Sequence, residues 1–190
     1  MEALSLISLL FVGLIPGLYL LFQYNSLVAL RNHTRESWSG IDTELKRRYD
    51  LIPRLVEVTR GYAAHEREVF ERVAALRERC AANHGTVRSQ SGDETELVSA
   101  LQTLLARVEA YPELKADAQF QNLHRELVNT EDRIQAARRF YNGNARDYRN
   151  KCETFPSSII ASMFGFQPLS FFEVEPAIRE APQVAGGLRE

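Results

Sequence analysis

The beginning of the chain is a continuous run of apolar positions. From Leu4 to Phe22 the sequence contains no charged side chain. A helix over this run would be about 28 Å long, because each residue adds about 1.5 Å, and the hydrocarbon core of a bilayer is about 30 Å thick. Pro16 and Gly17 lie near the middle, where membrane helices tolerate both residue types. The pattern predicts one transmembrane helix, with residues 1–23 as a membrane anchor.

A cleaved signal peptide is the alternative interpretation of this run. Such a peptide needs a basic stretch, a shorter apolar core and small residues at a cleavage site. Here no Lys or Arg precedes the run, and Gln23 and Tyr24 follow it where small residues would be needed. We therefore expect an uncleaved anchor that contacts the lipid bilayer through residues 4–22.

Flanking charges predict how the anchor is oriented. The first basic residues are Arg31 and Arg35, which follow the apolar run. Because positively charged flanks stay on the cytoplasmic side, the short N-terminus is expected outside the cell and the rest of the chain in the cytoplasm. The predicted location is the cell membrane, with a single pass.

After the anchor, apolar positions recur at spacings of three and four residues, which predicts amphipathic helices. The first such stripe begins at Leu27. We expect one long helix over about 26–82, kinked at Pro53 because proline removes a backbone donor and crowds the preceding turn.

Residues 83–93 are polar, include Gly85 and Gly92, and predict a loop. Ser91, with Glu94 three residues later, predicts a capping box at the start of a second helix. This helix should end near Tyr111, before a proline. It is much shorter than the third helix, so either the loop is partly helical or the third helix extends beyond its neighbours.

The third helix has the most regular pattern in the chain. Its seam alternates strictly between four- and three-residue steps, and such a seam needs partner helices to cover it. It should end at Phe155, and a short helix should run from Ser157 to about Phe164, where Gly165 stops it. The seam positions are Ala116, Phe120, Leu123, Leu127, Thr130, Ile134, Ala137, Tyr141, Asn144 and Tyr148.

Composition narrows the function classes. The formal net charge is −2, which argues against a nucleic-acid-binding protein, because such proteins usually carry a marked basic excess. The cysteines are Cys80 and Cys152, without a CxxC motif. So few cysteines in this spacing indicate reduced thiols of a cytosolic domain rather than a disulfide framework.

Catalytic and metal-binding patterns are missing from the sequence. His65 and Glu66 begin an HExxH motif, but Val69 stands where its second histidine belongs. A di-iron bundle needs Glu-x-x-His pairs, and Gln121 stands three residues before His124. No GxSxG, Walker or GxGxxG motif is present. We therefore expect no enzymatic activity, no metal and no cofactor.

Two groups of polar residues are the candidate interaction surface. In the first group, Arg47, Arg48 and Asp50 could instead pair with Glu126 and Glu131 on the third helix and fix the helix register. The second group belongs to a basic stretch over 133–151, which could contact anionic lipid headgroups if it reaches the membrane. The candidates are Lys46, Arg47, Arg48 and Asp50, then Arg138, Arg139, Tyr141 and Asn142.

Several separate motifs follow one another along the chain. They are YNSLV from Tyr24, WSGID from Trp38, LKRRYDLIPRLVE from Leu45, GYAAHE from Gly61, YPELKAD from Tyr111, NTEDRI from Asn129, ARRFYN from Ala137, FPS from Phe155 and FGF from Phe164. In this order they resemble the LemA family, over roughly residues 24–172. The resemblance implies an all-α fold, in which an N-terminal transmembrane helix is followed by an antiparallel cytoplasmic bundle of long helices over 24–172, and it implies no defined enzymatic activity. The Pro, Gly and charged residues over 175–190 separately predict a flexible tail, with bounds of 173–190.

These observations favour a membrane-anchored module that acts by interaction or as a scaffold. Its partner is expected to be another protein or a second copy of the chain, and no nucleic acid. A bundle that binds a ligand at polar seam positions, or one that binds anionic lipid through 133–151, is the alternative.

Overall fold

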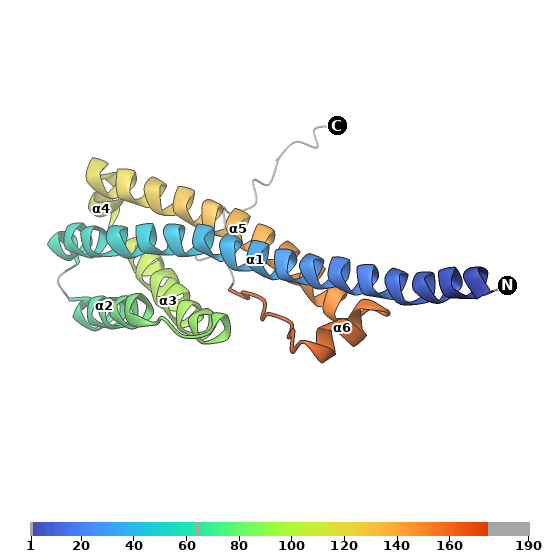
Figure 1. The fold of residues 1–190 in the computed structure, drawn as a ribbon. Coiled ribbons are helices and arrows are strands. Elements are labelled where there is room, and N and C mark those ends of the chain that lie inside the picture. The colour runs from blue at the N-terminus through green and yellow to red at the C-terminus, as the bar shows by residue number, and fades with distance from the viewer. Residues whose placement is uncertain (1, 64, 175–190) are drawn as a thin grey trace, which may run out of the picture. The chain divides into compact units, whose positions relative to one another are not determined.

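The structure is a computed structural model that describes residues 2–63 and 65–174, with side chains from Leu14 onward. All regular secondary structure in this part of the chain is helical (Figure 1). The helices are α1 (Glu2–Tyr62), α2 (Arg67–Ala82), α3 (Val87–Val108), α4 (Pro112–Ala116), α5 (Ala118–Glu153) and α6 (Ser157–Met163).

The chain forms two compact units, and both long helices contribute to each. Unit 1 contains Met1–Thr43 and Ala136–Phe172, and unit 2 contains Glu44–Gln135 and Glu173–Glu190.

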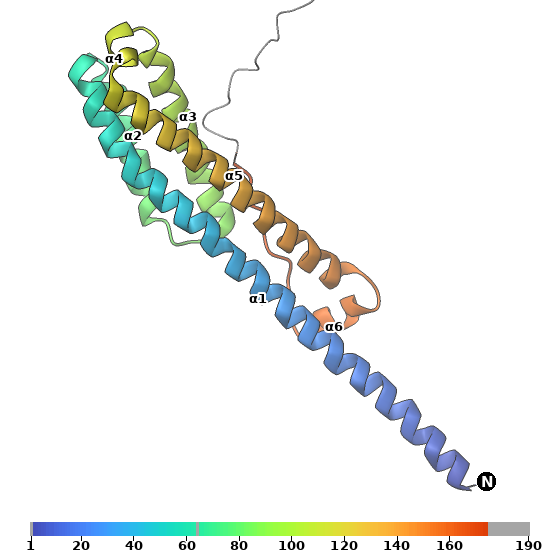
Figure 2. The same cartoon turned by 90° about the horizontal axis from the view of Figure 1, so that it is seen from above.

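In unit 1 the first part of α1 and the last part of α5 run side by side in opposite directions (Figure 2). They come close at Gly40, where an added Cβ would lie 4.0 Å from the Cβ of Ala137. α6 then folds back against the pair, and its Ile160 and Ala161 are buried. The core cluster consists of Leu27, Tyr148, Cys152, Ile160, Ala161 and Phe166, with Tyr24 and Val28 packed against it.

After α6 the chain crosses unit 1 without regular structure, and we call residues 165–172 the strap. It begins at Gly165, whose φ of 70° lies in the left-handed region that glycine adopts without strain. Tyr141 donates a hydrogen bond from its hydroxyl to the carbonyl of Ser170 at 2.8 Å. Asn142 bonds both backbone groups of Phe172, at 3.0 and 2.9 Å. Side chains of α5 thus satisfy strap polar groups that a helix would satisfy internally.

In unit 2 helices α2 and α3 form a hairpin that packs with the remaining parts of α1 and α5 (Figures 1 and 2). Thr86 caps α3, because its hydroxyl accepts a hydrogen bond from the amide of Ser89. Asp117 caps α5 in the same way through the amide of Phe120. The apolar core includes Ile52, Leu55, Phe70, Val73, Leu97, Leu101, Leu104 and Leu114.

The prediction of one helix over 26–82 is wrong. Pro53 does not end α1, but the helix stops at Tyr62 and α2 begins separately at Arg67. Gly61 weakens the helix just before this break. The separation lets the buried face of α2, with Phe70 and Val73, pack as part of a hairpin.

The loop predicted over 83–93 is confirmed only at its start, since α3 begins at Val87. The capping box at Ser91 is therefore wrong, and the Ser91 hydroxyl instead bonds the backbone of Glu173 at 2.8 and 3.0 Å. The longer α3 resolves the length mismatch in favour of a partly helical loop. The third helix is confirmed as α5, except that its first seam position, Ala116, belongs to α4. The end of α5 before Phe155 and the short helix that follows are confirmed as well.

The membrane segment predicted over 4–22 lies partly outside the residues described with side chains, which begin at Leu14. Within the described residues, no helix is long and apolar enough to cross a membrane. Residues 175–190 of the predicted tail are outside the description.

Candidate functional site

The most heavily buried polar site in unit 2 is centred on Arg48 of α1. Its side chain is 1% exposed, yet it carries a charge. The guanidinium donates to Glu131 of α5 at 2.8 Å and also pairs with Glu94 of α3. Both carboxylates are buried. One cation therefore joins three helices through two anions.

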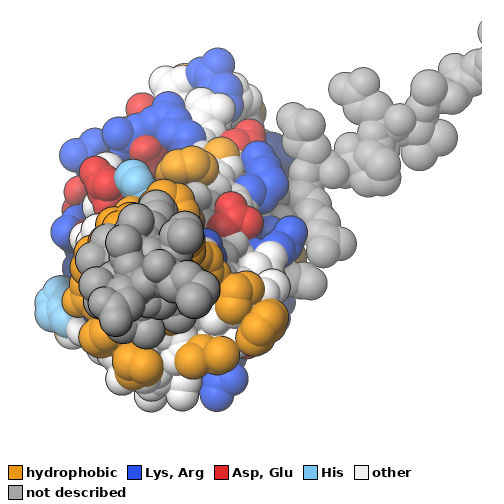
Figure 3. Space-filling view, turned by 45° about the vertical axis from the view of Figure 1, so that its right-hand side comes forward, with side chains coloured by type: hydrophobic (Ala, Val, Ile, Leu, Met, Phe, Trp, Pro, Cys, Tyr) orange, Lys and Arg blue, Asp and Glu red, His pale blue; other side chains and the backbone are white. Residues whose placement is uncertain are grey.

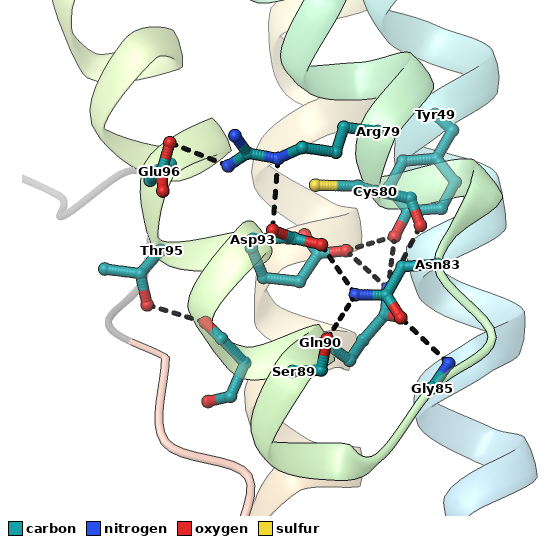
Figure 4. Close-up of polar contacts among 12 residues, drawn as sticks. Tyr49, Arg79, Cys80, Asn83, Gly85, Ser89, Gln90, Asp93, Thr95 and Glu96 are labelled. Carbon is teal, nitrogen blue, oxygen red and sulfur yellow. Dashed lines mark hydrogen bonds and ion pairs between the residues drawn. The ribbon is translucent and has the colours of Figure 1, made fainter.

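Tyr49 and Gln90 extend this cluster (Figure 4). The Tyr49 hydroxyl donates to Glu94. The Gln90 amide donates to the Tyr49 hydroxyl at 3.1 Å and to the carbonyl of Cys80 at 3.3 Å. The cluster therefore also reaches α2, and each of the four helices that meet here supplies at least one polar atom.

Burial and charge act in opposite directions on Arg48. Burial would lower its pKa, but the negative charges of Glu131 and Glu94 outweigh burial and hold the pKa above its ordinary value. For Tyr49, burial and the charge of Glu94 both raise the pKa. Arg48 is thus charged and Tyr49 neutral at physiological pH, which matches their roles as hydrogen-bond donors to the carboxylates.

A second polar group holds the turn between α2 and α3 (Figure 4). Arg79 pairs with Asp93 at 3.0 Å and with Glu96 at 2.7 Å. Asn83 donates to Asp93 at 2.6 Å, and its carbonyl oxygen accepts from the amide of Gly85 at 2.8 Å. These contacts fix the hairpin at its closed end.

The cluster constrains how the helices around it pack. Burial raises the pKa of the Cys80 thiol to about 12, so almost no nucleophilic thiolate exists at neutral pH. In the part of the chain that the structure describes, no three His, Cys, Asp or Glu residues are placed to hold a metal. A buried charge pair needs good geometry to offset desolvation, so Arg48 favours the one packing in which both carboxylates reach it.

Unit 1 has an aromatic site instead. Trp38 contacts Tyr141 and Phe172 edge to face, with ring centroids 5.4 and 5.3 Å apart. Further along α5, burial raises the pKa of the Tyr148 hydroxyl to about 12. The tyrosines of this core therefore remain neutral and serve in packing and, for Tyr141, in holding the strap.

The structure places the residues of the candidate interaction surface in different environments. In unit 2, Lys46, Arg47 and Asp50 are exposed, whereas Arg48 is buried. The predicted pairing of Arg48 with Glu131 is confirmed.

In unit 1, Arg139 is exposed and Arg138 and Asn142 are half-buried, whereas Tyr141 is buried. Tyr141 and Asn142 hold the strap through the hydrogen bonds described above. The role of the set as an interaction surface stays a prediction.

The sequence did not reveal Tyr49, Gln90 and Glu94 as members of one site. Gln90 falls in the stretch expected to be a loop, because buried polar residues break the apolar periodicity, and Glu94 was expected only to cap the helix that follows. Their separation by four residues, which places both on one helix face, is the signal that was available.

The fold and the sites define an all-helical bundle stabilised by a buried ion cluster. The chain belongs to the LemA family, because the model of that family matches residues 37–185.

Curated relatives have low sequence identity to the chain but align over most of its length. Magnetosome protein MamQ of Magnetospirillum gryphiswaldense is 25% identical over 202 positions, which cover 93% of this chain and 73% of the relative. Magnetosome protein MamQ 1 of Paramagnetospirillum magneticum is 26% identical over 183 positions, covering 83% and 67%. Protein LemA of Metamycoplasma hominis is 24% identical over 149 positions, covering 78% and 68%.

Proposed function

We propose that this protein is a membrane-anchored helical bundle that works by interaction on the cytoplasmic face and not by catalysis. The observation that carries the proposal is the contrast between the surfaces of α1. Leu14, Ile15, Leu18 and Phe22 are at least half exposed although they are apolar. Further along the same helix, apolar residues such as Ile41 and Leu45 are fully buried. Apolar exposure of that extent marks a surface that something else covers.

A bilayer is the covering that fits α1 best. Every residue from Leu14 to Tyr19 is exposed, and this stretch exceeds one helical turn. A partner helix would cover one stripe, whereas a helix that is apolar all round suits a lipid environment. The uncharged run continues back to Leu4, and Arg31 and Arg35 follow it, which supports a single pass with the N-terminus outside.

The remaining charged surface supports a role in interaction. The internal cluster engages Arg48, Glu94 and Glu131 in holding helices together. Lys46, Arg47 and Asp50 of unit 2 and Arg139 of unit 1 remain at the surface. A rigid bundle that presents charged helix faces is a common basis for recognition of another protein or of a second copy.

Site-specific photo-crosslinking in intact cells tests the interaction. A photoreactive amino acid is placed at Arg47 or Arg139, and at Arg72, which is equally at the surface but on α2, as a control. We expect discrete adducts from Arg47 or Arg139 that Arg72 does not give, with an adduct of doubled mass if the partner is a second copy. The same faint pattern from all three positions would contradict the proposal.

Binding of anionic lipid through 133–151 is the second candidate. It is favoured by the exposed Arg146 and by Arg149, whose guanidinium is held 4.3 Å from the ring of Phe171. A fluorophore at residue 146 of the full chain in vesicles tests it. Quenching by nitroxide-labelled lipid only when phosphatidylglycerol is present would support this candidate, and equal signals with and without it would eliminate it.

A further inference from the structure

The segment that follows α5 has an unusual composition for a surface-exposed part of a bundle. Residues 155–172 contain no Asp, Glu, Lys, Arg or His. Part of this segment packs inward, since Ser157, Ile160 and Ala161 of α6 are buried. The other face is apolar and open to the surroundings, with Phe155, Ile159, Met163 and Phe164 exposed by 77, 56, 64 and 47%.

This open face lies beside the end of the apolar run of α1. The ring of Tyr24 packs edge to face against the rings of Phe164 and Phe166, with ring centroids 4.9 and 5.6 Å apart. Leu21, which is 58% exposed, precedes Tyr24 by three residues and therefore lies on the same side of α1. The exposed side chains of α6 and those of α1 thus form one apolar surface at this end of unit 1, and hydrophobic side chains gather there in Figure 3.

Basic side chains lie along the edge of the apolar surface that is nearest the bundle. Arg31 lies 5.0 Å from the ring of Phe166, and Arg149 lies 4.3 Å from the ring of Phe171. Lys151 is half-buried just before the uncharged segment. An apolar face bordered by arginine and lysine is complementary to the boundary between acyl chains and anionic headgroups of a bilayer.

We propose that α6 is a second membrane contact, which inserts Ile159, Met163 and Phe164 into the lipid interface beside the emerging α1. The inference rests on the proposed membrane anchor and adds a site to it. One helix passing through a bilayer leaves the attached bundle free to tilt. A second contact held to α1 through Tyr24 restricts that tilt and keeps unit 1 against the membrane.

Fluorescence in reconstituted vesicles tests this contact in the full chain. The environment-sensitive dye NBD is attached to a cysteine introduced by the substitution Met163→Cys in α6 or, as a control, by Phe140→Cys in α5. The two positions are matched, being 64 and 65% exposed and both apolar. The native Cys80 and Cys152 are buried, and burial raises the pKa of each thiol, so they label slowly. The protein without an introduced cysteine gives the background signal from Cys80 and Cys152.

Vesicles of phosphatidylethanolamine and phosphatidylglycerol then carry a nitroxide quencher either near the headgroup or deep in the acyl chain. We expect the dye at residue 163 to shift to the blue and to lose fluorescence, most strongly with the shallow quencher. The dye at residue 140 should show neither change.

Every other outcome contradicts a specific part of the proposal. Failure of the protein to float with the vesicles would overturn the membrane anchor, and with it this inference. Floating protein with an unshifted dye at residue 163 would overturn the α6 contact alone. A blue shift without quenching would show that protein, such as a second copy, covers α6, and equal quenching at 140 and 163 would remove its assignment to α6.

Discussion

The two units use the same pair of long helices but fill their cores differently. Unit 2 places a charged arginine between two buried carboxylates, covered by a hairpin of two further helices. Unit 1 has a core of aromatic and aliphatic side chains, covered only by α6 and the strap. In the described part of the chain, exposed large apolar side chains are concentrated in unit 1 and include only Tyr62 in unit 2.

This difference relates core chemistry to surface role. In unit 2 four helices enclose the buried ion cluster. Its charges have lost their water and are stabilised only by the ion pairs and hydrogen bonds inside that enclosure. Unit 1 needs no such enclosure, since apolar groups tolerate a partial cover. It can therefore leave apolar surface open for a bilayer while its polar strap contacts hold the fold.

The native cysteines report on each unit separately. Cys80 is in unit 2 and is 1% exposed, and Cys152 is in unit 1 and is 8% exposed. A buried thiol reacts with an alkylating reagent mainly when its surroundings open. The alkylation rates of the two cysteines in isolated membranes therefore measure the opening of the two units in one sample.

Removal of the central cation should give the largest effect. Arg48→Ala leaves Glu94 and Glu131 buried without their partner, which costs about 3–5 kcal/mol. Alkylation of Cys80 should accelerate about a hundredfold or more, while that of Cys152 stays unchanged. The charge of Arg48 lowers the thiol pKa of Cys80, so its loss would by itself slow the reaction.

Two controls sharpen this prediction. Arg47→Ala removes the neighbouring exposed arginine and should change the free energy of unfolding by less than about 0.5 kcal/mol. Joint replacement of Arg48, Glu94 and Glu131 by Met and Leu should restore slow alkylation, because apolar packing can substitute for a buried ion cluster. Fast alkylation in Arg47→Ala and Arg48→Ala alike would contradict the assigned role.

Loss of the strap contacts should have a smaller effect, and it should act on Cys152 rather than on Cys80. Asn142→Ala removes both hydrogen bonds to the backbone of Phe172 and leaves those groups unsatisfied, at a cost of about 1–3 kcal/mol. Cys152 should now react faster while Cys80 is little affected. Asn150→Ala, an exposed substitution on the same helix, should leave both rates unchanged. Acceleration of Cys80 by Asn142→Ala would break the separation between the units.

The smallest effect concerns the cap of α5 in unit 2. The amide of Phe120 donates to the Asp117 carboxylate at 2.8 Å and holds the pKa of that carboxyl below its ordinary value. A lowered folded-state pKa stabilises the fold above the ordinary value, about 3.9, and this contribution is lost as the pH falls through the folded-state value.

Asp117→Ala should therefore destabilise unit 2 more at neutral pH than in strong acid, where only the neutral cap is lost. Urea unfolding of the detergent-solubilised chain, followed by circular dichroism at both pH values, measures the difference. Asp117→Asn keeps an acceptor for the Phe120 amide without the charge, so its stability should lack this pH dependence. An Asp117→Ala effect of equal size at both pH values would show that the charge contributes nothing.

The sequence predicts α5 well because its apolar seam is regular over the whole helix. The end of α5 and the short α6 follow from Pro156 and Gly165, whose backbone limits act locally. The break after Tyr62 was missed because Gly61 alone is a weak signal, and the separation of α2 from α1 depends on the packing of α2 with α3. The start of α3 was missed because buried polar residues such as Gln90 and Ser91 occupy positions where apolar ones would reveal a helix.

The candidate site was predictable only in part. The charges of Arg48 and Glu131 suggested an interhelical pair, and the structure contains it. Burial of that pair depends on Glu94, which lies far away in the sequence and on another helix. Tyr141 and Asn142 stand out as a polar pair in a helix, but the strap that they hold has no periodicity by which its position could be predicted.

The membrane anchor over residues 4–22 is the claim on which the functional account depends, and extraction of native membranes tests it directly. Membranes that contain the full chain are washed with alkaline carbonate, and intact cells are treated separately with protease from outside. The account predicts that the chain remains in the carbonate pellet and that its bundle is cleaved only after the cells are opened. Release of the intact chain into the carbonate supernatant, or digestion of the bundle in unopened cells, would contradict it.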